Sequence, residues 1–276
     1  MSLFYKIPIV NPRVIKINFF CETHNRGKIW AMKKAKSTQF FIQLSQLCLA
    51  IFIFFYSLSP KTAVLIKDKQ WQKNMVLNVV FLDGSSDLHQ LVRQTAPEWL
   101  QNTSLSFQFF DQLNQAPTQT HIRISFKLHS GSTLGDHQDY VSKTPTMNLF
   151  DLTSKHISDS RAQRLILHEF GHALGFEHEY RSRYWPYGER VIKQVTANCY
   201  PKMELIGYSP QLAVTHCKDI NATINSSLAY LTAYDENSIM NYPISFEQKD
   251  GSNKQIKAAV SLSILDRYAM ERWYGR

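Results

Sequence analysis

The chain has 276 residues, of which 44% are apolar and 19% are charged, a composition that excludes a disordered chain and suffices for one sizeable globular domain with an appendage. Its formal net charge is +9, but residues 1–61 hold nine Lys and Arg residues against Glu22 alone. The remaining 22 basic and 21 acidic residues leave 62–276 nearly neutral, so we expect no nucleic-acid partner.

The N-terminal region has the pattern of an export signal. Residues 1–31 show no pattern and are interpreted as an extension from a mis-called start, whereas Met32 opens a basic head before an apolar run at 40–58. This layout is typical of a secretory signal peptide, placed at 32–60, and predicts a secreted, periplasmic or extracellular protein. The alternative is an uncleaved anchor, because about 19 apolar residues can just span a bilayer; residues 40–58 would then be the only membrane contact, with the folded domain outside.

The domain, placed at 61–276, begins with alternating strands and a helix. Branched and aromatic residues predict strands at 77–82, 105–110 and 121–126. Apolar residues at helical spacing predict a helix over 85–101, in which Pro97 indicates a kink or an earlier end.

Polar loop residues and a short extended segment follow. The loop Asp136-His137-Gln138-Asp139 offers ligands for a second metal ion, but we interpret it as a solvated loop. Residues 146–149 form the next extended segment, and Ser158 or Asp159 can cap a helix that begins near Arg161. Histidines outside the motif described next are treated as structural or exposed, namely His24, His89, His121, His129, His156 and His216.

The helix from Arg161 carries the pattern H-E-x-x-H-x-x-G-x-x-H. Residues four apart lie on one helix face, so His168 and His172 can direct two imidazoles at one point beside Glu169. Gly175 suits the left-handed turn that ends a helix and lets His178 return to the same point. Three imidazoles and a carboxylate in this spacing predict one Zn²⁺ ion with a general base, and core histidines alone would explain neither Gly175 nor His178.

The C-terminal part is less regular. Cys199 and Cys217 could close a loop of about 19 residues as a disulfide in an exported protein, the alternative being two free thiols. A short helix is predicted at 189–198, and a C-terminal helix at 261–274. Between them, Ser238-Ile239-Met240-Asn241-Tyr242 reads as a tight turn that carries a methionine.

Together, the histidine pattern and this turn resemble the metzincin zinc metalloproteases, and within them the astacin-like branch, over about residues 70–276. Three features carry the resemblance to astacins: Glu179 directly after the third histidine, the S-I-M-x-Y sequence of the turn, and Tyr242 two places after Met240. Asn241 departs from it, because astacins usually have histidine there, but the turn should remain intact.

The resemblance implies an α+β fold: a mixed twisted sheet with an edge strand over the cleft, two long helices in an upper half at about 70–178, and a C-terminal helix in a lower half at about 179–276. It implies that Tyr242 binds the metal and stabilises the oxyanion, that Met240 is a structural floor, and that Glu179 makes a buried hydrogen bond. It also implies that the edge strand pairs with substrate through Pro145, Thr146, Met147, Asn148 and Leu149; the alternative is an ordinary edge strand.

The predicted function is therefore an exported zinc metalloendopeptidase that acts on protein or peptide substrates, as a monomer and without a further cofactor. His168, His172 and His178 would hold the ion, while Glu169 and Tyr242 would be catalytic. Two alternatives share the fold: a catalytically silent zinc-containing binding or adhesion module, and an amidase that acts on cell-wall peptides.

Overall fold

The computed structural model describes residues 63–153, 157–189, 191–193, 197, 199, 217, 224, 227–231 and 233–276. The predicted signal or anchor segment lies outside these residues, as do most of the loop between Cys199 and Cys217 and much of the predicted helix at 189–198. The described residues belong to one compact unit, Pro60–Arg276. Within them, no helix is long and apolar enough to cross a membrane.

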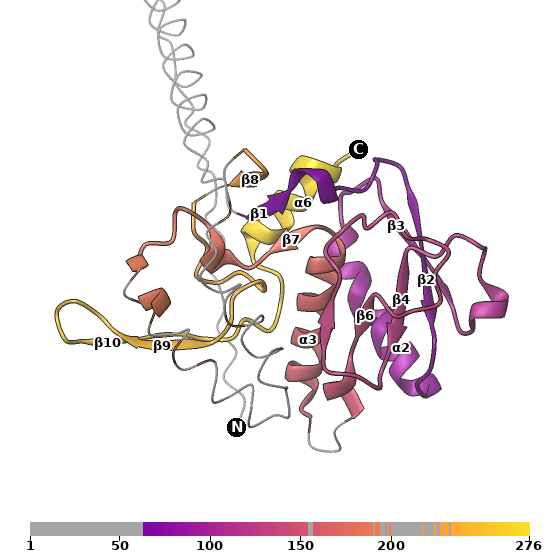
Figure 1. The fold of residues 1–276 in the computed structure, drawn as a ribbon, viewed down its shortest axis with the longest axis horizontal. Coiled ribbons are helices and arrows are strands. Elements are labelled where there is room, and N and C mark those ends of the chain that lie inside the picture. The colour runs from indigo at the N-terminus through magenta and orange to yellow at the C-terminus, as the bar shows by residue number, and fades with distance from the viewer. Residues whose placement is uncertain are drawn as a thin grey trace, which may run out of the picture. The chain divides into compact units, whose positions relative to one another are not determined.

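A five-stranded mixed sheet forms the centre of the upper half (Figure 1). Its order is β3-β2-β4-β6-β5, with β3 (Ser106–Phe110), β2 (Val76–Phe81), β4 (Ile122–Ser125), β6 (Met147–Asn148) and β5 (Gly131–Ser132). Neighbours are parallel except for β5, which runs antiparallel to β6. The strands predicted from the sequence at 77–82, 105–110, 121–126 and 146–149 are all present, each within about two residues.

The prediction that Pro145–Leu149 is the exposed edge strand is wrong. Met147 pairs with Ile124 of β4 on one side and with Ser132 of β5 on the other, and both Met147 and Leu149 are fully buried. Strand β5 occupies the edge among the described strands instead. Its two residues, Gly131 and Ser132, lack the branched or aromatic side chains that indicate a strand in a sequence.

Two helices pack against the sheet. Helix α2 (Ser86–Thr95) begins at Ser85, whose side chain accepts a hydrogen bond from the Leu88 amide, and passes into the 3-10 helix η2 (Ala96–Leu100) at Pro97. The α-helix thus ends just before Pro97, as predicted. Helix α3 (Asp159–Ala173) begins at Ser158, whose side chain makes no capping hydrogen bond, so the prediction that Ser158 caps it is wrong.

One hydrophobic core joins the sheet, both helices and the C-terminal helix. Trp99 is 1% exposed, donates its indole N–H to the Leu167 carbonyl and stacks on Phe176. Helix α6 (Ile264–Tyr274) begins at a capping box formed by Ser263 and Asp266. The core residues that α6 contributes are Ala269, Met270 and Tyr274.

Several short elements were not predicted. Strand β1 (Val64–Ile66) pairs antiparallel with β7 (Phe176–Glu177) and β8 (Ala229–Leu231) in a second sheet, and β9 (Ile244–Glu247) pairs with β10 (Asn253–Ile256) in a hairpin. Figure 1 shows this hairpin on the opposite side of α3 from the five-stranded sheet. The remaining 3-10 helices are η1 (Lys67–Lys69), η3 (Leu113–Gln115), η4 (Phe150–Thr153) and η5 (Glu179–Arg181).

A separate hydrophobic cluster lies within the lower half. It contains Tyr180, Val191, Ile244, Phe246, Ile256 and the disulfide between Cys199 and Cys217. The sequence interpretation of these two cysteines as a disulfide is thus borne out, and the bond lies against the core of this half.

Candidate metal centre

Three imidazoles converge on one point. His168 and His172 lie one turn apart on α3, and His178 follows β7. The Nε2 atom of His178 lies 3.1 Å from Nε2 of His168 and 3.1 Å from Nε2 of His172. Two nitrogens that bind one tetrahedral zinc ion at ~2.0–2.1 Å must lie roughly 3.3 Å apart, so the three donors fit that ion.

The two histidines on α3 each make a hydrogen bond through Nδ1, on the side of the ring away from the other ligands. Nδ1 of His168 lies 2.9 Å from the Ile239 carbonyl oxygen, and Nδ1 of His172 lies 2.8 Å from the Phe176 carbonyl oxygen. A carbonyl only accepts, so Nδ1 carries the proton and Nε2 keeps its lone pair for a metal. Burial lowers the pKa of both imidazoles, which keeps them neutral and able to bind an ion.

Gly175 makes the turn that brings His178 back. Its φ is +98°, and its N–H donates to the His172 carbonyl at 2.8 Å. A Cβ atom there would lie 3.1 Å from the Lys69 carbonyl oxygen and 3.1 Å from Leu65, so glycine satisfies both the conformation and the space. The predicted bend after α3 is present and is followed at once by β7.

Glu169 lies beside the ligands without a full set of partners. It is 6% exposed, and its Oε2 atom makes no hydrogen bond to any described residue. Burial raises the pKa of this carboxyl to about 8, against the opposing effect of the Arg164 guanidinium. A buried carboxylate oxygen without a partner is uncommon, and it belongs here to a residue adjacent to a metal ligand.

Met240 packs directly beneath the ligand helix. A Cβ atom on Gly171 would lie 2.3 Å from the Met240 sulfur, so this sulfur sits against α3 between the two ligand positions. Met240 is 1% exposed, and its carbonyl accepts a hydrogen bond from the Glu179 amide. Gly171, the one glycine within α3, thus stands where the methionine needs the space.

Buried carboxylates hold the methionine turn in place, and one of them, Asp266, was not among the residues predicted from the sequence. Asp266 accepts hydrogen bonds from the Ser238 hydroxyl at 2.7 Å and the Ile239 amide at 2.9 Å. Glu179 accepts from the Asp235 amide at 3.3 Å, which is the buried hydrogen bond expected for it. The sequence signal for Asp266 was its place three residues after Ser263, the spacing of a capping box.

Tyr242 lies over the same site. Its ring centroid is 4.5 Å from that of His178 and 5.3 Å from that of His168. The preceding residue, Asn241, is fully buried and donates its side-chain amide to the Asp235 carbonyl, so the turn is intact. The carbonyl of Asn241 accepts from Arg164 at 3.2 Å.

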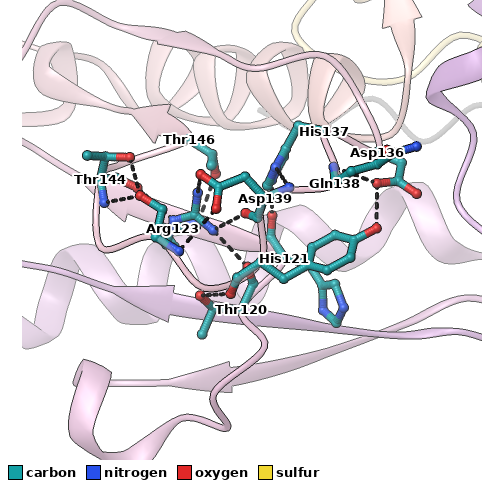
Figure 2. Close-up of polar contacts among 11 residues, drawn as sticks. Thr120, His121, Arg123, Asp136, His137, Gln138, Asp139, Thr144 and Thr146 are labelled. Carbon is teal, nitrogen blue, oxygen red and sulfur yellow. Dashed lines mark hydrogen bonds and ion pairs between the residues drawn. The ribbon is translucent and has the colours of Figure 1, made fainter.

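The loop at 136–139 is held by hydrogen bonds rather than solvated throughout. Figure 2 shows the guanidinium of Arg123, which is 1% exposed, directed at the backbone of this loop. It donates to the carbonyls of Thr120, Asp139 and Thr144, and Nε2 of His137 lies 2.8 Å from the His121 carbonyl oxygen (Figure 2). Within the described ranges, the only group of three potential metal ligands is His168, His172 and His178.

Solved structures with the same fold exist, whereas no protein-family model matches the chain and no curated protein is significantly similar to it. One structure of myroilysin aligns with a TM-score of 0.61 at 24% identity, over 77% of this chain and 98% of that chain. A second myroilysin structure gives 0.52 at 24% identity, over 79% and 92% of the two chains. High choriolytic enzyme 1, a hatching enzyme zinc-protease from Oryzias latipes (Medaka fish), gives 0.47 at 17% identity, over 76% and 96%. The α+β fold implied by the sequence motifs is confirmed, because the chain shares its fold with myroilysin over most of both chains.

Proposed function

We propose that the protein is an exported zinc-dependent metalloendopeptidase that hydrolyses peptide bonds in protein or peptide substrates. The observation that carries the proposal is the convergence of three Nε2 atoms, from His168, His172 and His178, next to the partly unpaired buried carboxylate of Glu169. Burying such a carboxylate costs free energy, and a purely structural zinc site has no use for it.

The three imidazoles would hold zinc through Nε2. A zinc ion with three protein ligands keeps a position for water, lowers the pKa of that water toward ~7 and polarises a carbonyl oxygen. Glu169 accepts a proton from the attacking water and donates it to the nitrogen of the departing amine. The water oxygen joins the carbonyl carbon, the C–N bond breaks, and a carboxylic acid and an amine are released.

Tyr242 and Met240 would have different roles. The Tyr242 ring lies against two ligand rings, which supports a hydroxyl that reaches the metal site and donates a hydrogen bond to the developing oxyanion. Met240 is buried against Gly171 and acts as a floor under the ligand helix, not as a ligand.

The substrate would pair with β5 rather than with residues 145–149. Strand β5 has no further strand beside it among the described strands, and a side chain on Gly131 would meet no atom within 4 Å. An extended peptide can add to such an edge through main-chain hydrogen bonds, with its own side chains left to the surrounding surface. Substrate would still bind by adding a strand to the sheet, as predicted, but next to β5 instead of β6.

Zinc content and proteolysis test the function together. We expect the purified protein to hold one zinc ion per chain, to cleave casein or gelatin, to lose cleavage with a chelator and to regain it with zinc. One bound zinc with no cleavage of any peptide would favour a binding or adhesion module. Release of cell-wall peptides without cleavage of proteins would favour an amidase.

Export and a monomeric state are part of the same proposal. The disulfide supports an oxidising compartment, because such bonds persist in secreted, periplasmic and extracellular proteins. N-terminal sequencing of the protein recovered from culture medium and from membranes distinguishes a cleaved signal from an anchor at 40–58. Sedimentation of the recovered protein tests the monomer.

A further inference from the structure

We propose that Tyr180 is a positioning residue for the third metal ligand, an inference that rests on the proposed zinc site. The Tyr180 hydroxyl lies 2.7 Å from Nδ1 of His178, on the side of the ring away from the convergence point. The two rings are stacked, with centroids 4.9 Å apart and an interplanar angle of 20°. Tyr180 is 4% exposed, so the contact is sheltered from water.

The three ligands differ in what anchors them. His168 and His172 hydrogen-bond to main-chain carbonyls, those of Ile239 and Phe176, whereas His178 hydrogen-bonds to a side chain. His178 also lies outside α3, in extended backbone with φ −62° and ψ 139° at the start of η5. A helix fixes the direction of the first two side chains, so the third depends more on its hydrogen-bond partner.

The phenol suits the tautomer that metal binding requires of this ring. When Nε2 of His178 binds a metal, Nδ1 carries the proton and donates a hydrogen bond to the Tyr180 oxygen 2.7 Å away. A hydroxyl oxygen accepts such a bond as a carbonyl does. Tyr180 thus completes a set of three acceptors, one behind each ligand.

The phenol is itself held by the core of the lower half. Tyr180 belongs to the hydrophobic cluster that includes Phe246 and the Cys199–Cys217 disulfide. Its ring is stacked with that of Tyr242, and the two ring centroids lie 6.0 Å apart. This packing fixes the ring from which the hydroxyl projects. The packing of the lower half therefore holds His178 through this hydrogen bond.

Substitution of Tyr180→Phe tests the proposal, because it keeps the ring and removes only the oxygen. We expect the zinc dissociation constant, measured by competition with a chelator, to rise about 10- to 100-fold. The absorption bands of the cobalt-substituted protein should also shift, since His178 would be held less firmly. Tyr184→Phe is the matched control, because Tyr184 is 48% exposed and stands just beyond η5; it should leave both readouts unchanged.

The stability of the metal-free protein separates positioning from general support. We expect the thermal midpoint of metal-free Tyr180→Phe to match that of the metal-free control, so that the loss appears only in metal binding. Zinc affinity within twofold of the wild type, or a fall in metal-free stability that accounts for the whole loss, would overturn the proposal. A wild type that binds zinc but cleaves nothing contradicts the proposed function and leaves this test valid, whereas a wild type that binds no zinc overturns both.

Discussion

The two halves of the molecule build the metal site by different means. The upper half presents His168 and His172 from one regular helix, so their spacing follows from helix geometry alone. Apart from β8 and α6, the described part of the lower half consists of a hairpin, turns and a disulfide-linked segment, yet it supplies the Ile239 carbonyl, the Met240 sulfur and the Tyr180 hydroxyl. Local structure thus places the ligands, and long-range contacts orient them.

The largest expected effect concerns the chemistry of the upper half. Glu169→Gln keeps the shape of the side chain and removes the base, so we expect cleavage to fall by about 10²- to 10⁴-fold while zinc content is unchanged. Peptidase assays and metal analysis measure the two quantities. Glu98→Gln, on η2, is the control; cleavage that survives in Glu169→Gln removes the base assignment.

Breaking the disulfide should affect the lower half strongly. Replacing Cys199 and Cys217 by serine releases a link across a sequence separation of 18 residues, and we expect the free energy of unfolding to fall by about 3 kcal/mol. Urea denaturation with and without reductant measures this change, and the reductant should have no effect on the double variant. An oxidised wild type that reductant does not destabilise would contradict this contribution.

A pH dependence should come from Asp266, the carboxyl that ties α6 to the methionine turn. Burial raises its pKa to about 6, and the hydrogen bonds from Ile239, Ser238 and Ser263 oppose the rise. The folded state therefore binds this proton more tightly than the unfolded state, and its contribution to stability is lost as pH rises from about 4 to about 6, by at most about 3 kcal/mol.

Asp266→Asn removes this titration. The variant loses hydrogen-bond acceptors and should be less stable at every pH, but the gap between wild type and variant should shrink as pH rises through this range. Urea denaturation at several pH values provides the test. Glu179 and Asp235 also face this cluster and remain in both proteins, and a constant gap would assign the pH dependence to Glu179, whose pKa burial raises.

The smallest expected effect tests the contact between the halves. In Gly171→Ala the new methyl group would overlap the Met240 sulfur and approach Trp99, so we expect a loss of about 1–3 kcal/mol in the free energy of unfolding. Gly131→Ala is the control for stability, because its methyl group would meet no atom within 4 Å. Equal stability of the two variants would show that Met240 moves aside freely.

The elements that could be predicted from the sequence are those with a local signal. The strands β2, β3 and β4, the helix α3 and the turn at Gly175 carry period-two, period-3.6 or glycine signals that are read locally. Strand β5 has two small residues and no such signal, so the edge was assigned to 145–149 by mistake. Which strand lies outermost depends on pairing between distant segments, and the sequence of one segment alone does not determine that pairing.

By itself, the sequence determined the chemical inventory of the site: two imidazoles and a carboxylate at helical spacing, a glycine that ends the helix, a third imidazole just beyond it, and a methionine turn downstream. It did so because helix periodicity and the left-handed preference of glycine act within a few residues. Only the tertiary structure decided that β5 lies at the edge of the described strands, that Asp266 holds the methionine turn and that Tyr180 stands behind His178. Asp266 reaches the turn across more than 20 residues, and Tyr180 depends on packing in the lower core, so these contacts exist only once the chain has folded.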